Sequence, residues 1–522
     1  MSDNGTTGDS GKHGVSRRRF VQAAGATGVV AGLAGCASDG GSGGSGGDGG
    51  SGGDGGSGGD GGSSGSGGGN GGGSTTVEIG FDPVILQNAE EEVRQAFRDA
   101  GVPDNIEISF VPRDQDTGAA RANYNRLLSA GETSPDLFLM DNGWTNIFIQ
   151  RGLIKNLSAD FFSDDMLSTV ESDYFSAFTA TARDPSSGDL FGVPMFPDFP
   201  TMLYRKDLVE EAGYSPESNN WATEPMTWQE WSNIAADVQE NSGVDYGFTT
   251  QWDIYVGTAC CTFNEVMSSW GGAYFGGRDN LFGPVGDRPI TVNEPETVQS
   301  LNMMRKFVHD EEFGGEFSDY GGGFTPQEIL GWTEETSRAP FASGNAVFHR
   351  NWPYAISISG ADPAESDSDP EPFGEDLGTM PIPYAVPESE AAQPGTGGTT
   401  SALGGWHLTA NPNSDKEEAQ LAIYDAIMQD SFNLDMLDIW GWLPPKPELF
   451  ASDAAREQEP VGRYMDTLRV AGNNTMARPV TAVWSNQQSN IAQQANRAVG
   501  QETDSQSAMD TLQQSLAETE SN

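Results

Sequence analysis

The run of glycine, serine and aspartate between residue 37 and about residue 75 most constrains what this chain can fold into. It holds almost no apolar side chain that could nucleate a core, so we expect a flexible tether. Any folded body is therefore confined to the residues from Thr76 onward. Because a single core stops growing at roughly 250–300 residues, this body is long enough for two lobes.

Residues 1–35 resemble a twin-arginine export signal, since Arg17 and Arg18 precede an apolar stretch that is too short to span a bilayer. That stretch ends in a lipobox-like Leu-Ala-Gly-Cys, whose cleavage would leave Cys36 as a lipid-bearing first residue. The alternative is an ordinary cleaved signal with an incidental cysteine. We expect residues 36–75 to tether a body outside the cytoplasm, anchored to the outer face of the cell membrane.

The charge balance excludes one class of partner and indicates a habitat. The 27 Lys and Arg against 76 Asp and Glu give a net charge of 27 − 76 = −49. Binding a phosphate backbone depends on basic residues, so we expect no nucleic-acid partner. Such a surplus is tolerable where concentrated salt shortens the Debye length to about 3 Å, which favours a halophilic source. The alternative is an acidic surface protein of a mesophile.

From Thr76 the hydrophobic pattern alternates between strand and helix spacing. This order predicts a largely parallel sheet flanked by helices. The expected strands are one from Val77, Ile106 to Phe110 and Leu137 to Met140; the expected helices are Ala89 to Ala100, Tyr124 to Ala130 and Trp144 to Arg151. Capping patterns at Thr227 and Ser414 predict two later helices, and a third should run from about Ser489 to Val499. Residues 276–289, 311–326 and 359–397 are expected to be surface loops.

Cysteine, histidine and catalytic motifs give mostly negative results. Cys260 and Cys261 are adjacent and are interpreted first as two buried thiols, with a vicinal disulfide as the alternative. The four histidines are widely separated, so we expect no metal and no cofactor. No nucleophile elbow, zinc-binding helix or phosphate-binding loop is present, which argues against an enzyme. A glycosidase pair could still be hidden among so many carboxylates.

Aromatic residues lie beside polar ones near the ends of predicted strands. Ligands of open α/β sheets bind at the carboxyl ends of the strands. A sugar presents apolar C–H patches that stack on an indole and hydroxyls that need hydrogen bonds, so this mixture suits a sugar. Each tryptophan could instead pack in a core, and Asp141 and Asp198 could cap helices or turns. The candidates are Asp141, Trp144, Phe196, Asp198, Trp352, Gly405, Trp406, Arg478 and Trp484.

Several short stretches occur in an order that resembles the solute-binding proteins of ABC importers, in particular the group of trehalose/maltose-binding proteins. The clearest are Pro135 to Asp141, Gly192 to Leu208, Pro225 to Trp228, Phe341 to Pro353, Gly405-Trp406, Gly441 to Pro444 and Ala477 to Val480. The resemblance implies an α/β fold of the type II periplasmic-binding-protein kind. Its two lobes would each hold a mostly parallel sheet flanked by helices, and hinge crossings would join them.

By the same resemblance, residues 76–195 and 350–403 would form the N-terminal lobe, and residues 196–349 and 404–522 the C-terminal lobe. The crossings would lie near Val193 to Thr201, Ala346 to Trp352 and Leu403 to Trp406. The nine candidates above match the sugar contacts of the group, except that Phe196 stands where a tyrosine is expected. Gln87, Asn88 and Glu90 compete for the group's acidic contact near the N-terminus.

These observations predict a monomeric, exported lipoprotein that captures a disaccharide or short oligosaccharide and delivers it to an ABC permease, without catalysis. Within the same fold, the alternative solute is a polyol or glycerol-3-phosphate. A lipid-anchored glycoside hydrolase and a surface adhesin or sensor subunit are the alternatives from other classes.

Overall fold

The computed structural model describes residues 74–159 and 161–521. The predictions for Arg17, Arg18, Cys36 and nearly all of the tether lie outside these residues. The first strand begins at Thr75, one residue inside the expected tether, so that boundary is corrected. In the described part of the chain, no helix combines the length and the apolar character that a membrane crossing needs.

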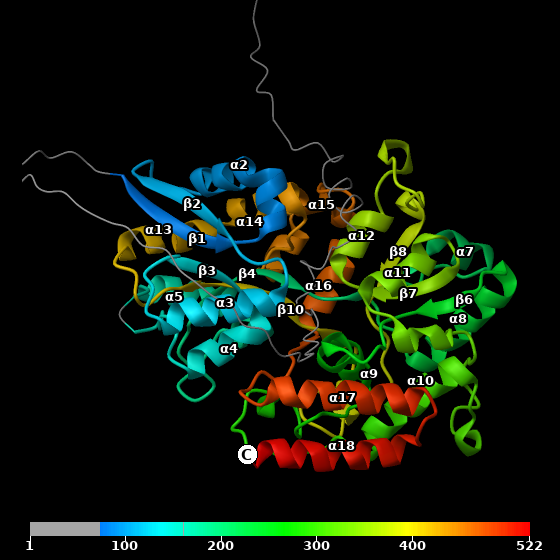
Figure 1. Cartoon of the computed structure of the whole chain (residues 1–522). Helices are drawn as coiled ribbons and strands as arrows, with labels where there is room; N and C mark the ends of the chain where they lie inside the picture. The colour runs from blue at the N-terminus through cyan, green and yellow to red at the C-terminus, as the bar shows by residue number, and fades with distance from the viewer. Residues whose placement is uncertain (1–73, 160, 522) are drawn as a thin grey trace, which may run out of the picture.

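The first lobe is built on a five-stranded sheet with the order β2-β1-β3-β10-β4 (Figure 1). Only β10 runs antiparallel to its neighbours, so the sheet is mostly parallel as expected. The strands are β1 (Thr75–Phe81), β2 (Ile106–Pro112), β3 (Leu137–Asp141), β4 (Gly192–Asp198) and β10 (Gly404–Ala410). The helices are α2 (Pro83–Asp99), α3 (Thr117–Ser129), α4 (Asn142–Gln150), α5 (Asp164–Asp173), α6 (Ser176–Ala180), α13 (Glu417–Ile427) and α14 (Asp430–Trp440).

Local chemistry explains why these elements begin where they do. The Asp82 side chain accepts hydrogen bonds from the backbone N–H groups of Val84 and Ile85, which starts α2 at the proline after it. Every residue of β3 is buried, as a central strand covered on both faces requires. The predicted alternation of strands and helices up to α4 is confirmed, but α2 begins six residues and α3 seven residues earlier than expected.

The second lobe is built on a four-stranded sheet with the order β6-β7-β5-β8, in which only β5 is antiparallel to its neighbours. Its strands are β5 (Thr201–Arg205), β6 (Tyr246–Thr249), β7 (Ala346–Asn351) and β8 (Leu377–Met380). The helices are α7 (Lys206–Glu211), α8 (Trp228–Ser242), α9 (Phe263–Ser269), α10 (Pro295–His309), α11 (Glu334–Ala342), α12 (Pro353–Ser359), α15 (Asp453–Arg456), α16 (Met465–Asn473), α17 (Trp484–Val499) and α18 (Ser505–Glu520).

The two predicted helix caps have different outcomes. The Thr227 hydroxyl accepts a hydrogen bond from the Glu230 N–H group and starts α8, as its pattern predicts. The Ser414 hydroxyl does not cap α13, because the helix begins after Lys416. The hydroxyl accepts from the Lys416 N–H group (3.2 Å), before the helix, and donates to Asp136 (2.6 Å).

The expected division into lobes is wrong in its later half. β8, in the range 350–403, pairs with β5 of the second lobe. β10, in the range 404–522, pairs with β3 and β4 of the first. The strand β8 also replaces part of the loop expected over 359–397. These pairings join residues far apart in the sequence, and no local pattern specifies them.

Three segments cross between the lobes. The chain passes from β4 to β5 through Phe199 and Pro200, as expected. It passes back at Leu403, between β10 and the short strand β9 (Ser401–Ala402), which pairs with β11 (Thr475–Met476). No crossing occurs near Ala346 to Trp352, because β7 remains in the second sheet. The third crossing follows Trp442, which packs in the first core while Leu443 packs in the second.

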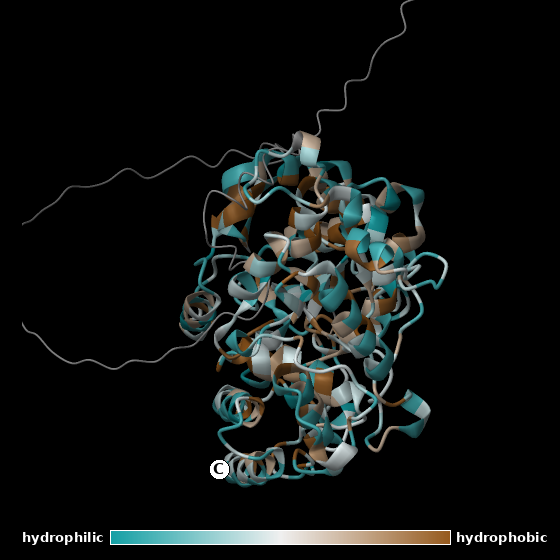
Figure 2. Cartoon of the chain, turned by 90° about the vertical axis from the view of Figure 1, so that its right-hand side faces the viewer, coloured by the Kyte–Doolittle hydropathy of each residue, from teal (hydrophilic) through white to brown (hydrophobic). Residues whose placement is uncertain are grey.

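Each lobe has its own hydrophobic core, and hydrophilic residues predominate on the outer helices and loops (Figure 2). The last two helices, α17 and α18, pack side by side against the second lobe (Figure 1). Cys260 and Cys261 lie buried in that core and form a vicinal disulfide, so the first interpretation of two thiols is corrected. Because short crossings join two separate cores, the two lobes can move relative to each other by a hinge motion.

Candidate functional site

Three neighbouring strands bring four of the predicted residues to one face of the first sheet. Trp406 on β10 lies opposite both Asp141 on β3 and Phe196 on β4. Asp198 lies two residues beyond Phe196, opposite Gly404. Because β10 runs antiparallel, its beginning meets the carboxyl ends of β3 and β4. The prediction that these residues gather at the strand ends is therefore confirmed.

Arg478 bridges the lobes. It follows β11 in the second lobe, and its Nη2 donates to Asp141 Oδ1 (2.9 Å) and Asn142 Oδ1 (2.6 Å) in the first. Asp141 Oδ1 also accepts from the N–H group of Gly143 (2.7 Å), so this carboxylate caps α4 as well. Burial raises the pKa of Asp141, and the charge of Arg478 partly offsets that rise. A Cβ atom at Gly143 would lie 2.6 Å from Arg478 Cζ, so the glycine permits this approach.

Asp198 has a different environment. Its side chain is 6% exposed, and its buried Oδ2 accepts no hydrogen bond from a described residue. Burial raises the pKa of Asp198 well above its ordinary value; Arg350 opposes this rise and the negative charge of Asp141 adds to it. A buried acceptor without a partner costs roughly 1–3 kcal/mol. Asp141 Oδ2 is likewise buried without a partner among the described residues, but Asp141 forms an ion pair with Arg478, whereas Asp198 forms none with a described residue.

The predicted tryptophans are all buried in the present arrangement. Trp144 and Trp406 pack edge to face with ring centroids 5.5 Å apart, in the first core. Trp352 is 0% exposed in the second core, with the Arg350 guanidinium 5.1 Å from its ring, and Trp484 packs near Tyr274 in the same core. All four tryptophans thus pack in the cores, and two of them, Trp352 and Trp406, have indole N–H groups that donate to no described residue.

Gly405 is required by its conformation. Its φ angle is +117°, in the region that side chains rarely adopt, and an added Cβ would lie 2.5 Å from the carbonyl oxygen of Phe196. The glycine therefore lets β10 approach β4 closely where the two strands carry site residues. In the structure its role is one of backbone geometry.

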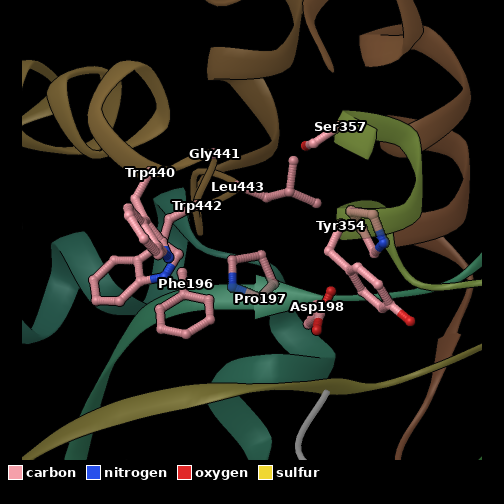
Figure 3. Close-up of a pocket in the computed structure, with 10 residues that line it drawn as sticks. Phe196, Pro197, Asp198, Tyr354, Ser357, Trp440, Gly441, Trp442 and Leu443 are labelled. Atoms are coloured by element: carbon pink, nitrogen blue, oxygen red, sulfur yellow. The ribbon is translucent and has the colours of Figure 1, made fainter. Parts of the chain in front are cut away.

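A small pocket between the lobes lies beside these residues, and its free space of about 20 Å³ is enough for about one water molecule. Of the nine predicted residues, only Phe196 and Asp198 line it. Figure 3 shows the Asp198 carboxylate between Pro197 and the ring of Tyr354. The other lining residues are Pro353 and Ser357 on α12, Trp440 at the end of α14, and Gly441, Trp442 and Leu443 at the third crossing.

Four aromatic rings line this pocket, and sequence reasoning missed three of them, those of Tyr354, Trp440 and Trp442. Trp442 stacks on Phe196 with centroids 4.0 Å apart and planes 15° apart. The indole N–H of Trp442 is buried without a partner among the described residues. The Gly441 to Pro444 and Phe341 to Pro353 stretches carry part of the family resemblance, and that signal could have pointed to Trp442 and Tyr354. Their distance in the sequence from β4 concealed the contact.

None of the residues that compete for an acidic contact near the N-terminus, Gln87, Asn88 and Glu90, lines the pocket. Glu90 pairs with Arg94 at the surface (2.5 Å), and Asn88 donates to a carbonyl within its own helix. Asp82, at the end of β1, is buried and ion-paired with Arg113, whose guanidinium lies 4.3 Å from the Trp406 ring. The buried acid next to the predicted residues is thus Asp82, which the sequence analysis did not consider.

The arrangement suits binding through stacking and hydrogen bonds. Among residues 74–159 and 161–521, no group of three or more His, Cys, Asp or Glu side chains could hold a metal ion. The two histidines nearest the site by sequence, His349 and His407, are buried, and burial lowers the pKa of each to about 3. They are therefore neutral near pH 7 and serve as hydrogen-bonding groups inside the lobes.

Comparison with solved structures shows the same fold. Maltose-bound MalE3 of T. maritima has a TM-score of 0.62 and 24% identity, and the match covers 85% of this chain and 99% of that one. The cyclic alpha-maltosyl-1,6-maltose binding protein of Arthrobacter globiformis has a TM-score of 0.62 and 19% identity, with 86% and 98% covered. The two-lobed type II fold is thereby confirmed.

Curated relatives and a family profile agree with this fold. A probable ABC transporter-binding protein of Deinococcus radiodurans is 27% identical over 61% of this chain, and the match spans 64% of that relative. A putative binding protein of Brucella abortus is 30% identical over 31% of this chain and 34% of its own length. The profile described as bacterial extracellular solute-binding protein matches residues 86–424. Since that match covers more than half of the sequence, the chain belongs to the family of bacterial extracellular solute-binding proteins, which bind solutes and are not enzymes.

Proposed function

We propose that this protein is the sugar receptor of an ABC importer, which captures a disaccharide or short oligosaccharide between its lobes and delivers it to a membrane permease. One observation carries the proposal: the pocket between the lobes combines stacked aromatic rings with a buried carboxylate that has no partner. A sugar ring offers C–H patches for the aromatic faces and hydroxyl donors for Asp198. The names of the maltose- and maltosyl-maltose-binding structures support the same ligand class.

The nine predicted residues fall into two groups, those that line the pocket and those that do not. Phe196 and Asp198 line it directly, and we propose that Trp442 and Tyr354 contribute to the same surface. The remaining seven lie buried and would meet the solute when the lobes separate at the three crossings. Binding would then follow population shift, because only a closed form contacts the solute from both lobes. The seven are Asp141, Trp144, Trp352, Gly405, Trp406, Arg478 and Trp484.

A phosphate-bearing solute such as glycerol-3-phosphate fits less well. A phosphate site needs guanidinium or ammonium groups that can turn toward the anion. The three arginines nearest the predicted residues already pair with buried carboxylates: Arg113 with Asp82, Arg350 with Glu265, and Arg478 with Asp141. This observation favours a solute without negative charge.

We further propose that residues 1–35, with Arg17 and Arg18, direct export through the twin-arginine route, and that lipidated Cys36 anchors a monomer through the glycine-rich tether. The net charge of −49 supports a halophilic source, because salt screens repulsion at the surface. Mass spectrometry of the protein from its native membrane tests the anchor: a lipid-modified first residue at Cys36 supports it, and an unmodified mature terminus contradicts it.

Thermal unfolding of the protein in molar salt, with a panel of sugars, sugar alcohols and glycerol phosphate, tests the binding proposal. A ligand that binds only the folded state stabilises it by about 2.7 kcal/mol at a hundredfold excess over Kd. We expect a shift with at least one di- or oligosaccharide, recovered intact by chromatography. Hydrolysis of that sugar would favour the glycosidase alternative. No shift with any sugar would overturn the proposal.

A further inference from the structure

The Asp198 carboxylate has no directly paired cation among the described residues, although the charge of Arg350 acts on it. Among the described residues it forms no ion pair and no hydrogen bond, although its side chain is 94% buried and its Oδ2 is fully buried. The neighbouring guanidinium groups are committed elsewhere. Arg350 donates two hydrogen bonds to the Glu265 carboxylate, from Nε (2.8 Å) and Nη2 (2.6 Å). Arg478 forms an ion pair with Asp141. Of the buried acids around the site, Asp198 is thus the one whose charge the protein leaves unbalanced.

Glu265 cannot easily release Arg350. One of its oxygens also accepts from the N–H group of Ala402 in the hinge strand β9 (2.8 Å), and Arg350 Nη1 donates to Gln251 Oε1 (2.9 Å). Breaking a buried pair of this kind leaves two uncompensated charged groups in the interior, which is strongly unfavourable. The excess negative charge therefore stays at Asp198 unless a proton or a ligand neutralises it.

The surroundings of Asp198 favour a cation as that ligand. The pocket beside it is walled by the rings of Phe196, Tyr354, Trp440 and Trp442 (Figure 3). Aromatic faces attract cations through their quadrupole, and the attraction grows when water is excluded. A neutral hydroxyl gives Asp198 a hydrogen bond, whereas an ammonium group gives it both a hydrogen bond and a countercharge.

We propose that the solute is an amino sugar, whose protonated amine pairs with Asp198 while its ring stacks on the aromatic wall of the pocket. This inference rests on the proposed sugar-receptor function and names the sugar's class. Burial raises the pKa of Asp198, so the unliganded site can neutralise itself with a proton, and the amine replaces that proton. The acidic surface of the protein is a separate source of attraction for cations, which the test has to remove.

Isothermal titration calorimetry at 2 M NaCl separates these effects, since salt screens surface charges and leaves a buried pair nearly intact. The probes are matched sets: glucose, glucosamine and N-acetylglucosamine; cellobiose, fully deacetylated chitobiose and diacetylchitobiose; and trehalose with 2-amino-2-deoxytrehalose. In at least one set we expect the amine to bind ten times more tightly than its hydroxyl counterpart, and we expect N-acetylation to abolish that advantage.

The variant Asp198→Asn removes the charge with little change of shape. It should weaken binding of the amine at least ten times more than binding of the neutral sugar, because only the amine loses a countercharge. Glu211→Gln, an exposed acid at the end of α7 that also loses one charge, is the matched control and should change neither affinity. Should Asp198→Asn not fold, the wild-type comparison decides alone.

The outcomes separate this inference from the proposed function. Tight binding of neutral sugars with no preference for their amines overturns the amino-sugar inference and leaves a sugar receptor. Equal losses for amine and neutral sugar in Asp198→Asn likewise overturn it, because the carboxylate would then act only as an acceptor. Binding of no sugar in any set overturns the function on which the inference rests.

Discussion

At the scale of single residues, Trp442 is the side chain on which the aromatic wall depends. It stacks on Phe196 with ring centroids 4.0 Å apart and packs in the core of the first lobe, directly before the third crossing. Changing Trp442→Leu keeps the site apolar but removes the flat face. We expect sugar affinity to fall by about 1–3 kcal/mol, measured by calorimetry.

The matched control is Trp270→Leu. That ring is half-buried in the second lobe, where its N–H group contacts Met303, and it does not line the pocket. Both variants should lose some stability, but only Trp442→Leu should lose affinity. Equal affinities for the two variants would make Trp442 a packing residue.

Gly143 tests the bridge between the lobes. A methyl group there would lie 2.6 Å from Arg478 Cζ and 2.7 Å from Asp141 Oδ1, inside the ion pair. Gly143→Ala should raise helix propensity slightly yet lower the free energy of unfolding by about 1–3 kcal/mol, because the pair must move apart.

Denaturant unfolding of Gly143→Ala and Gly331→Ala measures this difference. Nothing lies within 4 Å of the position a Cβ would take at Gly331, so that variant should stay within about 0.5 kcal/mol of the wild type. If Gly143→Ala is as stable as the wild type, the Arg478–Asp141 pair contributes little to holding the lobes together.

At the scale of elements, local patterns predicted most of the first lobe and less of the second. The strand β3 and the cap of α8 were predictable because burial on both faces and a Thr-x-x-Glu pattern act within a few residues. β8 was taken for loop because four residues between glycine- and proline-rich segments give little signal. Its place beside β5 and the place of β10 beside β3 depend on long-range pairing. The same reason hid Trp442 and Tyr354, while Asp198 was visible beside its own strand.

Strand β10 carries a histidine whose burial links stability to pH. His407 lies between the Thr145 hydroxyl (2.8 Å) and the Thr181 hydroxyl (3.1 Å), and burial lowers its pKa to about 3. In the unfolded chain its pKa is near 6.5, so between these values the unfolded state binds one more proton. The free energy of unfolding should therefore fall as pH drops below about 6.5, by up to about 1.4 kcal/mol per unit for this residue.

The variant His407→Gln should remove that contribution. It should be less stable than the wild type at pH 7, and the deficit should shrink by about 2 kcal/mol at pH 5, where the wild type has lost its advantage. Denaturant unfolding at both pH values measures the deficit, and buried carboxylates such as Asp141 cancel because both proteins contain them. A deficit that is equal at the two pH values would contradict the assignment of His407 as a buried neutral group.

At the scale of the whole molecule, two cores and three crossings explain how a stable protein can move. Each lobe has a hydrophobic core of its own, so a hinge motion leaves most of both cores intact. What must change on opening is the interface itself, which holds the Arg478–Asp141 pair and indole donors without partners. A polar solute would offer acceptors to those indole N–H groups, so the proposed binding would favour the closed form.

The excess of 49 negative charges acts on the same scale, because it opposes compaction of the whole chain. Salt shortens the Debye length from about 10 Å at 0.1 M to about 3 Å at 1 M, so we expect Tm to rise steeply between 0.1 and 2 M NaCl. Four exposed acids without an ion pair, Asp104, Glu211, Glu328 and Glu448, provide a variant in which each is replaced by its amide.

Neutralising them takes the net charge from −49 to −49 + 4 = −45. The variant should melt at a higher temperature than the wild type at 0.1 M NaCl and at the same temperature at 2 M, because salt removes the repulsion that the substitutions relieve. Salt also strengthens hydrophobic burial, but that effect is common to both proteins. Parallel curves for the two proteins across the salt range would mean that surface repulsion does not limit the stability of this fold.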